Sequence, residues 1–178
     1  MGLGEKLKNL PESVEYFNTE LTTAYTTLKE RGLGQLREEF TTGSGSTAGY
    51  RIYKWVRCAA GVVKGNVCHY SDNNASKIAI AASSLNSALI AGIALTTAST
   101  SNYTWIQVGG VNNHVLTDGG VAKSDQLIKD STTAGMADTA VTTDSDVGGV
   151  LDSRYIFGVA LDADSGSVCP AVLLKGLI

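Results

Sequence analysis

The chain has 178 residues, of which 43% are hydrophobic and only 17% are charged, and its formal net charge at pH 7 is -3. This length suits one compact domain with a core, with or without an arm, and is too short for two ordinary catalytic domains. The weak acidity predicts no nucleic-acid partner, and the short apolar stretches and polar start MGLGEKLKNL predict cytoplasmic synthesis with no membrane association.

The first 49 residues carry a large share of the charge and run into TTGSGSTAG, which is typical of a flexible linker. The apolar side chains before that linker recur at helical spacing and predict a helix over about residues 12–31. Threonines at positions 22, 23, 26 and 27 favour an extended chain instead, because β-branched residues lower helix propensity. We therefore predict an N-terminal arm over residues 1–49, partly helical or extended. Its apolar side chains need a partner surface, and they are Val14, Phe17, Leu21 and Leu28.

From Tyr50 onward, short segments of β-branched and aromatic residues alternate with turn sequences such as SDNNAS, TDGG and DADSGS. The strand-like segments are YRIYKWVRCA, NVCHY, KIAIA, ALIAGIAL, YTWIQV, HVLT, QLIKD, RYIFGVAL and AVLLKG. This pattern predicts a mainly β domain over residues 50–178.

Two parts of this β-domain resemble each other. The stretch IAGIALTTASTSNYTWIQVGG aligns with IFGVALDADSGSVCPAVLLKG, and upstream GVVKGNVC resembles GVAKSDQL. The alignment matches glycines in pairs, Gly92 with Gly158 and Gly110 with Gly176. A unit of a few strands exposes one whole apolar face, so two such units must pack together. We predict a small β-barrel or sandwich built from two similar β units, residues 61–110 and 120–176, with Gly92 and Gly158 at equivalent kinks or close backbone approaches.

The cysteines and histidines form no catalytic or zinc-binding pattern. Cys58, Cys68 and Cys169 are odd in number and lack C-x-x-C spacing, so we expect reduced, partly buried thiols. His69 follows Cys68 directly, and strand alternation sends their side chains to opposite faces. A dyad across strands, such as His114 with Cys58, is the remaining alternative. With no phosphate-binding loop, dinucleotide fingerprint or H-E-x-x-H, the sequence predicts a non-enzyme without a cofactor.

Asp162, Asp164 and Gly166 form D-x-D-x-G, which is part of a calcium-loop signature. No glutamate follows at the required distance, and the first unit has Thr96 and Ala98 at the matching places. We expect a solvated turn without a metal, with calcium binding as the alternative.

The aromatic residues cluster in two strand-like segments. The four that we single out are Tyr53, Trp55, Tyr103 and Trp105. Cross-strand packing in the core is one interpretation, and an interface between subunits is another. Stacking on a carbohydrate is a third. We predict that these side chains form the core or the oligomer interface.

The run YTWIQVGG has the form Y-x-W-I-Q-x-x-G, follows an A-G-[IV]-A-L segment and precedes a last strand near the C-terminus. In these features residues 61–178 resemble small structural proteins of tailed-bacteriophage heads, the decoration or cement proteins. The resemblance implies a compact β fold, a homotrimer, and an arm that reaches onto the major capsid protein. It also implies a place on the capsid exterior of the virion after synthesis in the host cytoplasm.

From this resemblance we expect a structural virion protein that binds the outer surface of the capsid and stabilises it. The alternative is a head-fibre or tail-associated module that binds a receptor or a glycan. A cement protein covers the capsid lattice in many copies, whereas an adhesin is present in few copies, so copy number separates the two.

Overall fold

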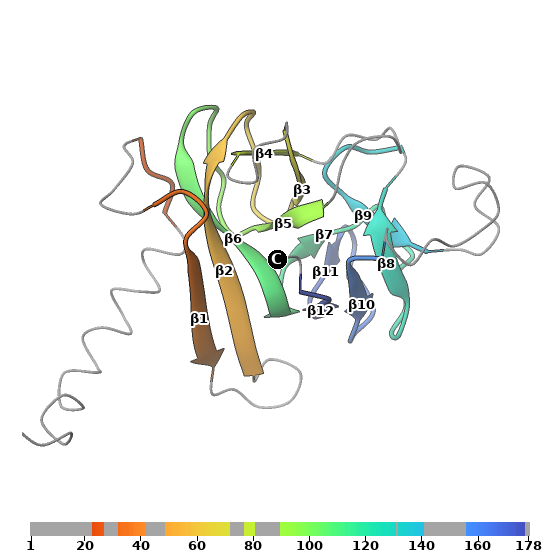
Figure 1. The fold of residues 1–178 in the computed structure, drawn as a ribbon. Coiled ribbons are helices and arrows are strands. Elements are labelled where there is room, and N and C mark those ends of the chain that lie inside the picture. Colours follow the sequence, from red (N-terminus) through yellow and green to blue (C-terminus); the bar gives the residue numbers. More distant parts are fainter. Residues whose placement is uncertain are drawn as a thin grey trace, which may run out of the picture.

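The structure is a computed structural model that describes residues 23–26, 32–41, 49–71, 77–80, 90–130, 132–140 and 156–176. The described residues form strands and turns and contain no helix (Figure 1). The prediction of a mainly β fold is confirmed. The strands are β1 (Leu36–Thr41), β2 (Gly49–Cys58), β3 (Val67–Tyr70), β4 (Lys77–Ile80), β5 (Ile90–Ala94), β6 (Tyr103–Asn112), β7 (Val115–Leu116), β8 (Gln126–Lys129), β9 (Ala137–Thr139), β10 (Gly158–Ala160), β11 (Val168–Cys169) and β12 (Val172–Leu174).

Most strands belong to one 10-stranded sheet with the order β1-β2-β4-β3-β5-β6-β12-β10-β8-β9, and β7 and β11 form a second, 2-stranded sheet. Strand β2 also pairs with β6, so that β2, β4, β3, β5 and β6 pair in a ring. The ladder between β2 and β4 is parallel, and the other ladders of the large sheet are antiparallel. The expected barrel or sandwich is thus a strongly curled sheet, and no single barrel closes around all the described strands.

The strand order is symmetric about the ladder between β6 and β12. On one side lie β5, β3 and β4, and on the other lie β10, β8 and β9. The registers within the two units also agree. Val67 pairs with Ile93 as Gln126 pairs with Val159, and Ala94 pairs with Ile106 as Ala160 pairs with Val172. The expectation of two similar β units is therefore confirmed at the level of strand pairing.

The turns that precede β3 and β8 repeat the same hydrogen bonds. Gly65 and Ser124 occupy equivalent places with φ of 87° and 76°, and each amide donates to the last residue of β5 or β10 at 2.8 Å. Asn66 and Asp125 come next. Each side-chain oxygen accepts a hydrogen bond of 2.7 Å from the amide three positions earlier. The likeness between GVVKGNVC and GVAKSDQL thus reflects one turn used twice.

Each unit is preceded by a further strand, β2 before the first and β7 before the second, and from here on we count each of these strands, with the turn that leads into it, as part of its unit. Cys58 at the end of β2 pairs in parallel with Ile78, and Thr117 after β7 pairs in parallel with Ala137. However, β2 has 10 residues and β7 has 2. The first unit is further widened by β1, which pairs with β2 along its whole length. Figure 1 shows β1 and the long β2 together at one side of the molecule.

The hydrophobic core joins the two units. One cluster, around Phe157 and Leu127 of the second unit, also contains Val67 and Ile93 of the first. Another cluster lies within the ring of the first unit, around Val56, Ile106 and Val108. Because the first cluster draws on both units, part of the apolar surface of each unit is buried only against the other.

Part of the predicted N-terminal arm belongs to the sheet, which corrects the boundary at residue 49. Leu36–Thr41 forms β1, and Tyr25 bridges Tyr103 through two backbone hydrogen bonds of 2.8 and 2.7 Å. Residues 23–26 are the described part of the helix predicted over residues 12–31, and they are not helical. The β-branched threonines favour this extended backbone. The rest of that predicted helix lies outside the described residues.

Candidate functional site

The structure brings the four predicted aromatic residues together on one face of β2 and β6. Tyr53, Trp55 and Trp105 are buried, and Tyr103 packs against them half-buried. Trp55 and Trp105 are direct cross-strand neighbours with ring centroids 5.2 Å apart, and Tyr103 stacks on Trp55 at 6.4 Å. Such ring pairs contribute roughly 0.5–1.5 kcal/mol beyond the area that they bury. In this structure the aromatic residues pack within one chain.

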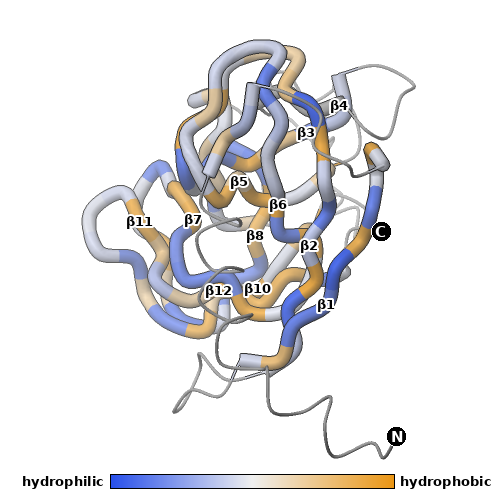
Figure 2. Tube along the Cα trace, turned by 90° about the vertical axis from the view of Figure 1, so that its left-hand side faces the viewer, coloured by the Kyte–Doolittle hydropathy of each residue, from blue (hydrophilic) through white to orange (hydrophobic). Residues whose placement is uncertain are grey.

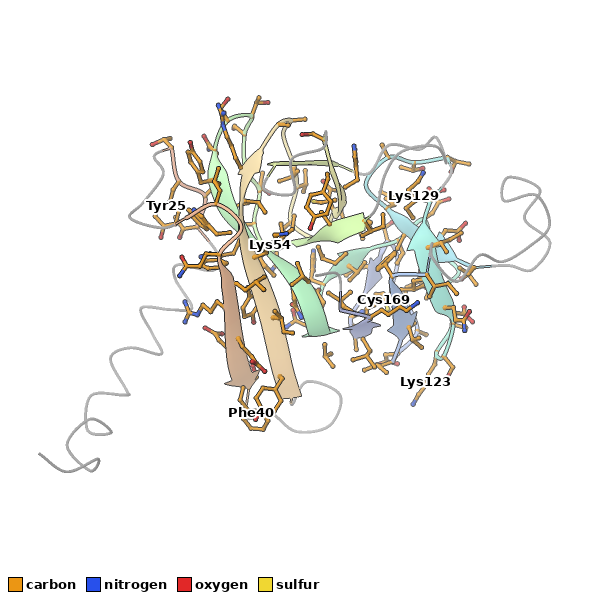
Figure 3. All side chains as sticks on the ribbon, viewed as in Figure 1. Tyr25, Phe40, Lys54, Lys123, Lys129 and Cys169 are labelled. Carbon is orange, nitrogen blue, oxygen red and sulfur yellow. The ribbon has the colours of Figure 1, made fainter. Side chains whose placement is uncertain are left out.

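The N-terminal segment covers this aromatic cluster. The ring of Tyr25, which is labelled in Figure 3, lies 5.8 Å from that of Trp55. The Gly34 amide donates to the Trp55 carbonyl at 2.8 Å, and the Trp55 amide donates to the Gln35 carbonyl at 2.9 Å. Both indoles are 0% exposed, so neither can stack on a carbohydrate without a rearrangement of the segment above it.

Exposed apolar side chains gather instead along β1. Of the six large hydrophobic side chains that are exposed in the described part of the chain, four lie in β1, in the turn before it or at the start of β2. Three of them form what we call the β1 patch, defined as Leu36, Phe40 and Tyr50. Phe40 and Tyr50 are cross-strand neighbours whose ring centroids are 5.0 Å apart at 60°. Figure 3 shows Phe40 at the far end of β1, pointing away from the body of the molecule.

Sequence reasoning missed the β1 patch because LREEFT reads as part of a charged arm. The available signal was the spacing of Leu36 and Phe40, since residues four apart lie on the same face of a strand. On the other face, Arg37 and Glu39 form an ion pair with Nη2 and Oε1 2.5 Å apart. Figure 2 shows β1 at the margin of the fold, where the hydrophilic residues 37–39 lie between the hydrophobic Leu36 and Phe40.

The cysteine side chains are placed for packing and are poor nucleophiles. All three thiols are free and buried. Burial raises the pKa of Cys58 to about 11 and raises the pKa of Cys68 and Cys169 above the ordinary value. These groups are therefore protonated at neutral pH, whereas a nucleophilic cysteine must be a thiolate.

The two histidines lie in different surroundings. His69 follows Cys68 in β3 and is half-buried. His114 lies beside the turn at Gly65, and its imidazole pKa is lowered by desolvation and, to a lesser extent, by the nearby Lys64 charge. The thiols of Cys68 and Cys169 donate to backbone carbonyls, that of Cys68 to Asn66 at 3.5 Å and that of Cys169 to Asp162 at 3.3 Å.

The aspartates of the D-x-D-x-G run take part in local hydrogen bonds. Asp164 Oδ2 accepts from Thr117 Oγ1 at 3.0 Å, and Asp162 Oδ1 accepts from the amide of Ala163 at 3.0 Å. Within the described ranges, no three His, Cys, Asp or Glu side chains converge in a way that could hold a metal ion. The same residues include no helix long and apolar enough to span a membrane.

The predicted capsid-binding side chains of the arm lie outside the described residues. They are Val14, Phe17, Leu21 and Leu28. Among the described residues, the surface that could bind a partner is therefore the β1 patch together with the outer edge of β1. We treat this surface as the candidate site of interaction.

No protein-family model and no curated protein matches this chain. Among solved structures, the chain is similar to the N base of the head fibre gp8.5 of bacteriophage phi29, with 16% sequence identity and a TM-score of 0.47. The matched region covers 72% of this chain and 98% of that chain. The function of this chain is therefore argued from its own residues and contacts.

Proposed function

We propose that this chain is a structural protein of a tailed-phage virion that binds the outer surface of the capsid as a decoration protein. The Y-x-W-I-Q-x-x-G run carries the proposal, because it resembles that family and forms β6, which pairs with β2, β5 and β12. The run thus lies in the strand through which the first unit pairs with β12 of the second.

The chemistry of the described side chains supports a binding role over a catalytic one. The buried thiols are neutral, and Asp162 and Asp164 are engaged in local hydrogen bonds. The low charge of the chain suits a protein that buries surface against other proteins. The β1 patch offers an apolar surface for such burial.

In this proposal the protein is a homo-oligomer, a trimer as the resemblance implies, that contacts the major capsid protein. The arm supplies part of the contact through Val14, Phe17, Leu21 and Leu28. Each such side chain contributes roughly 1.5–3 kcal/mol when it becomes fully buried. That gain offsets part of the entropy that is lost when an arm becomes ordered on binding.

The proposal is tested by adding the purified protein to expanded capsids that lack it. Quantitative mass spectrometry gives the copies bound per particle, and a heating series gives the temperature at which the capsids burst. We expect saturation of the capsid lattice and a higher bursting temperature. Binding at only a few sites per particle, with no thermal protection, would favour the head-fibre module instead.

The role of the arm is tested by deleting residues 1–22. A deletion of residues 1–49 would also remove β1 and the contact between Tyr25 and Trp55, and would confound binding with folding. The shorter deletion should leave the β-domain folded and weaken its binding to capsids. Undiminished binding of the truncated protein would show that the β-domain alone is the anchor.

A further inference from the structure

We propose that the outer edge of β1 is a docking site for an extended segment of a partner protein, which adds to the sheet as an antiparallel strand. The segment has an apolar–basic–apolar pattern at alternate positions. This inference rests on the proposed function, since on a capsid the segment would belong to a neighbouring virion protein. The geometry of the edge, its apolar side chains and its charge each support it.

The backbone of β1 is paired on one side only. Its six residues pair with β2 in one uninterrupted register, from Leu36 opposite Lys54 to Thr41 opposite Gly49. Within the described residues no strand pairs with the other side of β1. The opposite end of the sheet differs, because Thr117 bridges Ala137 of β9 there. A strand edge that no second described strand covers is a ready template for another strand.

The side chains along this edge are apolar where an incoming strand would cover them. Leu36, Phe40 and Tyr50 are 45%, 59% and 62% exposed, and all three lie on one face of the β1–β2 ladder. Three charged residues lie between these apolar ones, Arg37, Glu38 and Glu39, and such charges protect natural sheet edges from unspecific pairing, so a partner strand has to match them. A strand laid beside β1 would place alternate side chains against Leu36 and Phe40.

Glu38 determines which type of residue is favoured at the middle position of the incoming strand. It is exposed between Leu36 and Phe40 on the same face and forms no ion pair with any described residue. On the other face, the opposite charges of Arg37 and Glu39 already form an ion pair with each other. A lysine or arginine directly opposite Glu38 would complete the pairing, because opposite charges at facing positions of a ladder attract.

The same charge argues against a second copy of this chain as the occupant. If two β1 strands paired with Leu36 opposite Phe40, Glu38 of each copy would face Glu38 of the other. A shift by one residue would place Glu38 opposite Glu39. Like charges at facing positions are destabilising, so on the face of the β1 patch a basic partner strand fits better than a second copy, even though in the first register Arg37 of each copy would face Glu39 of the other on the opposite face.

The probe is a blocked peptide of sequence Val-Thr-Lys-Thr-Val, titrated into the full-length ¹⁵N-labelled protein; its two valines and its lysine lie on one face of an extended strand. We expect the amide signals of β1 to shift while those of β9 stay in place. A Val-Thr-Glu-Thr-Val peptide should bind roughly five- to tenfold more weakly, because the central pair then repels. The Glu38→Lys variant should reverse this preference, and a Glu39→Gln variant is the matched control that should keep it.

Two N-methylated forms of the lysine peptide test strand addition directly. Methylation of the amides that face β1 should abolish docking, whereas methylation of the amides that face solvent should leave it intact. Equal loss in both forms, equal affinity of the lysine and glutamate peptides, or no shift in β1 would each overturn the proposal. Shifts in β1 that depend on protein concentration without peptide would also overturn it, since they would indicate self-pairing.

The wild-type and Glu38→Lys proteins are then compared in capsid binding. If the peptide docks on β1 but the wild-type protein does not bind capsids, the proposed function fails and the docking site stands. If both proteins bind capsids equally and the peptide does not dock, the docking site fails and the proposed function stands. Weaker capsid binding by the variant together with peptide docking supports both.

Discussion

The two units share one set of strand pairings, which we call the frame, and they differ in the strands and side chains that are added to it. In the first unit the long β2 presents Trp55 to Trp105, and β1 adds a further strand. In the second unit β7 is short, and His114 and Ala171 stand at the places that correspond to the two tryptophans. The frame alone needs neither the tryptophans nor the extra strand. The additions to the first unit are therefore where we expect interaction with partners, and the second unit serves as an internal control for stability.

The largest expected effect is the loss of an indole that only the first unit has. Trp105 is 0% exposed and packs against Trp55. Trp105→Ala should lower the free energy of unfolding by about 3–5 kcal/mol, through lost burial and the cavity that remains. In the second unit, Ala171→Gly should cost only about 1 kcal/mol. Urea denaturation monitored by circular dichroism gives both values, and equal costs would show that the aromatic cluster adds nothing to the frame.

The next effect concerns two aligned glycines with nearly the same backbone. Gly110 and Gly176 have φ of 77° and 81°. A Cβ at Gly110 would overlap the Tyr50 carbonyl of β2, whereas a Cβ at Gly176 would meet nothing within 4 Å. Gly110→Ala should therefore cost about 3 kcal/mol or more, from both the clash and the backbone.

Gly176→Ala should cost only about 1 kcal/mol, from the left-handed backbone alone. Thermal denaturation at matched protein concentrations compares the two variants. A larger loss for Gly176→Ala would mean that β2 is not held against Gly110 as the structure describes.

A smaller effect separates the two equivalent turns. The Asn66 amide group also donates from Nδ2 to the Gly135 carbonyl at 3.2 Å, whereas Asp125 accepts from Thr139 Oγ1 at 3.1 Å. Asn66→Asp replaces a donor by an acceptor in a buried site and should cost about 2 kcal/mol. Asp125→Asn keeps an acceptor oxygen in a more exposed site and should stay within about 0.5 kcal/mol of wild type. The reverse ranking in urea denaturation would contradict the turn geometry.

The smallest effect is a pH dependence of the unfolding free energy that arises from His114, the residue that corresponds to Trp55. Desolvation lowers the pKa of His114 in the folded protein. Below the ordinary pKa of about 6.5, the unfolded chain then binds a proton that the folded chain does not, so stability falls as the pH falls. His114→Gln should flatten this part of the dependence of the unfolding free energy between about pH 7 and pH 5. An unchanged slope would mean that His114 titrates alike in both states.

Much of the frame could be predicted from sequence because the duplication leaves local marks. The pairing of Gly92 with Gly158 reflects one close approach used twice, since a Cβ at Gly92 would meet the Gln107 carbonyl at 2.5 Å and one at Gly158 would meet the Leu173 carbonyl at 2.9 Å. The short strand β9 escaped detection because ADT has no apolar alternation. The arm boundary was misplaced because β1 is held by backbone pairing to β2, which leaves little trace in composition.

The candidate site was the part that sequence could least predict. The aromatic residues were recognisable as a group, but whether they face the core or a neighbour depends on Tyr25, whose ring packs against Trp55 from a distant part of the chain. Exposure of Phe40 and Tyr50 likewise follows from the position of β1 at the sheet edge, which is a property of the whole topology.

A cryo-electron-microscopy map of capsids saturated with the protein tests the central claim most directly, namely that the additions to the first unit form the binding surface. The account predicts many copies on the outer surface of the capsid, with density of a neighbouring protein running alongside β1 and over Phe40 and Tyr50. A map in which the second unit faces the capsid and the edge of β1 remains bare would contradict it.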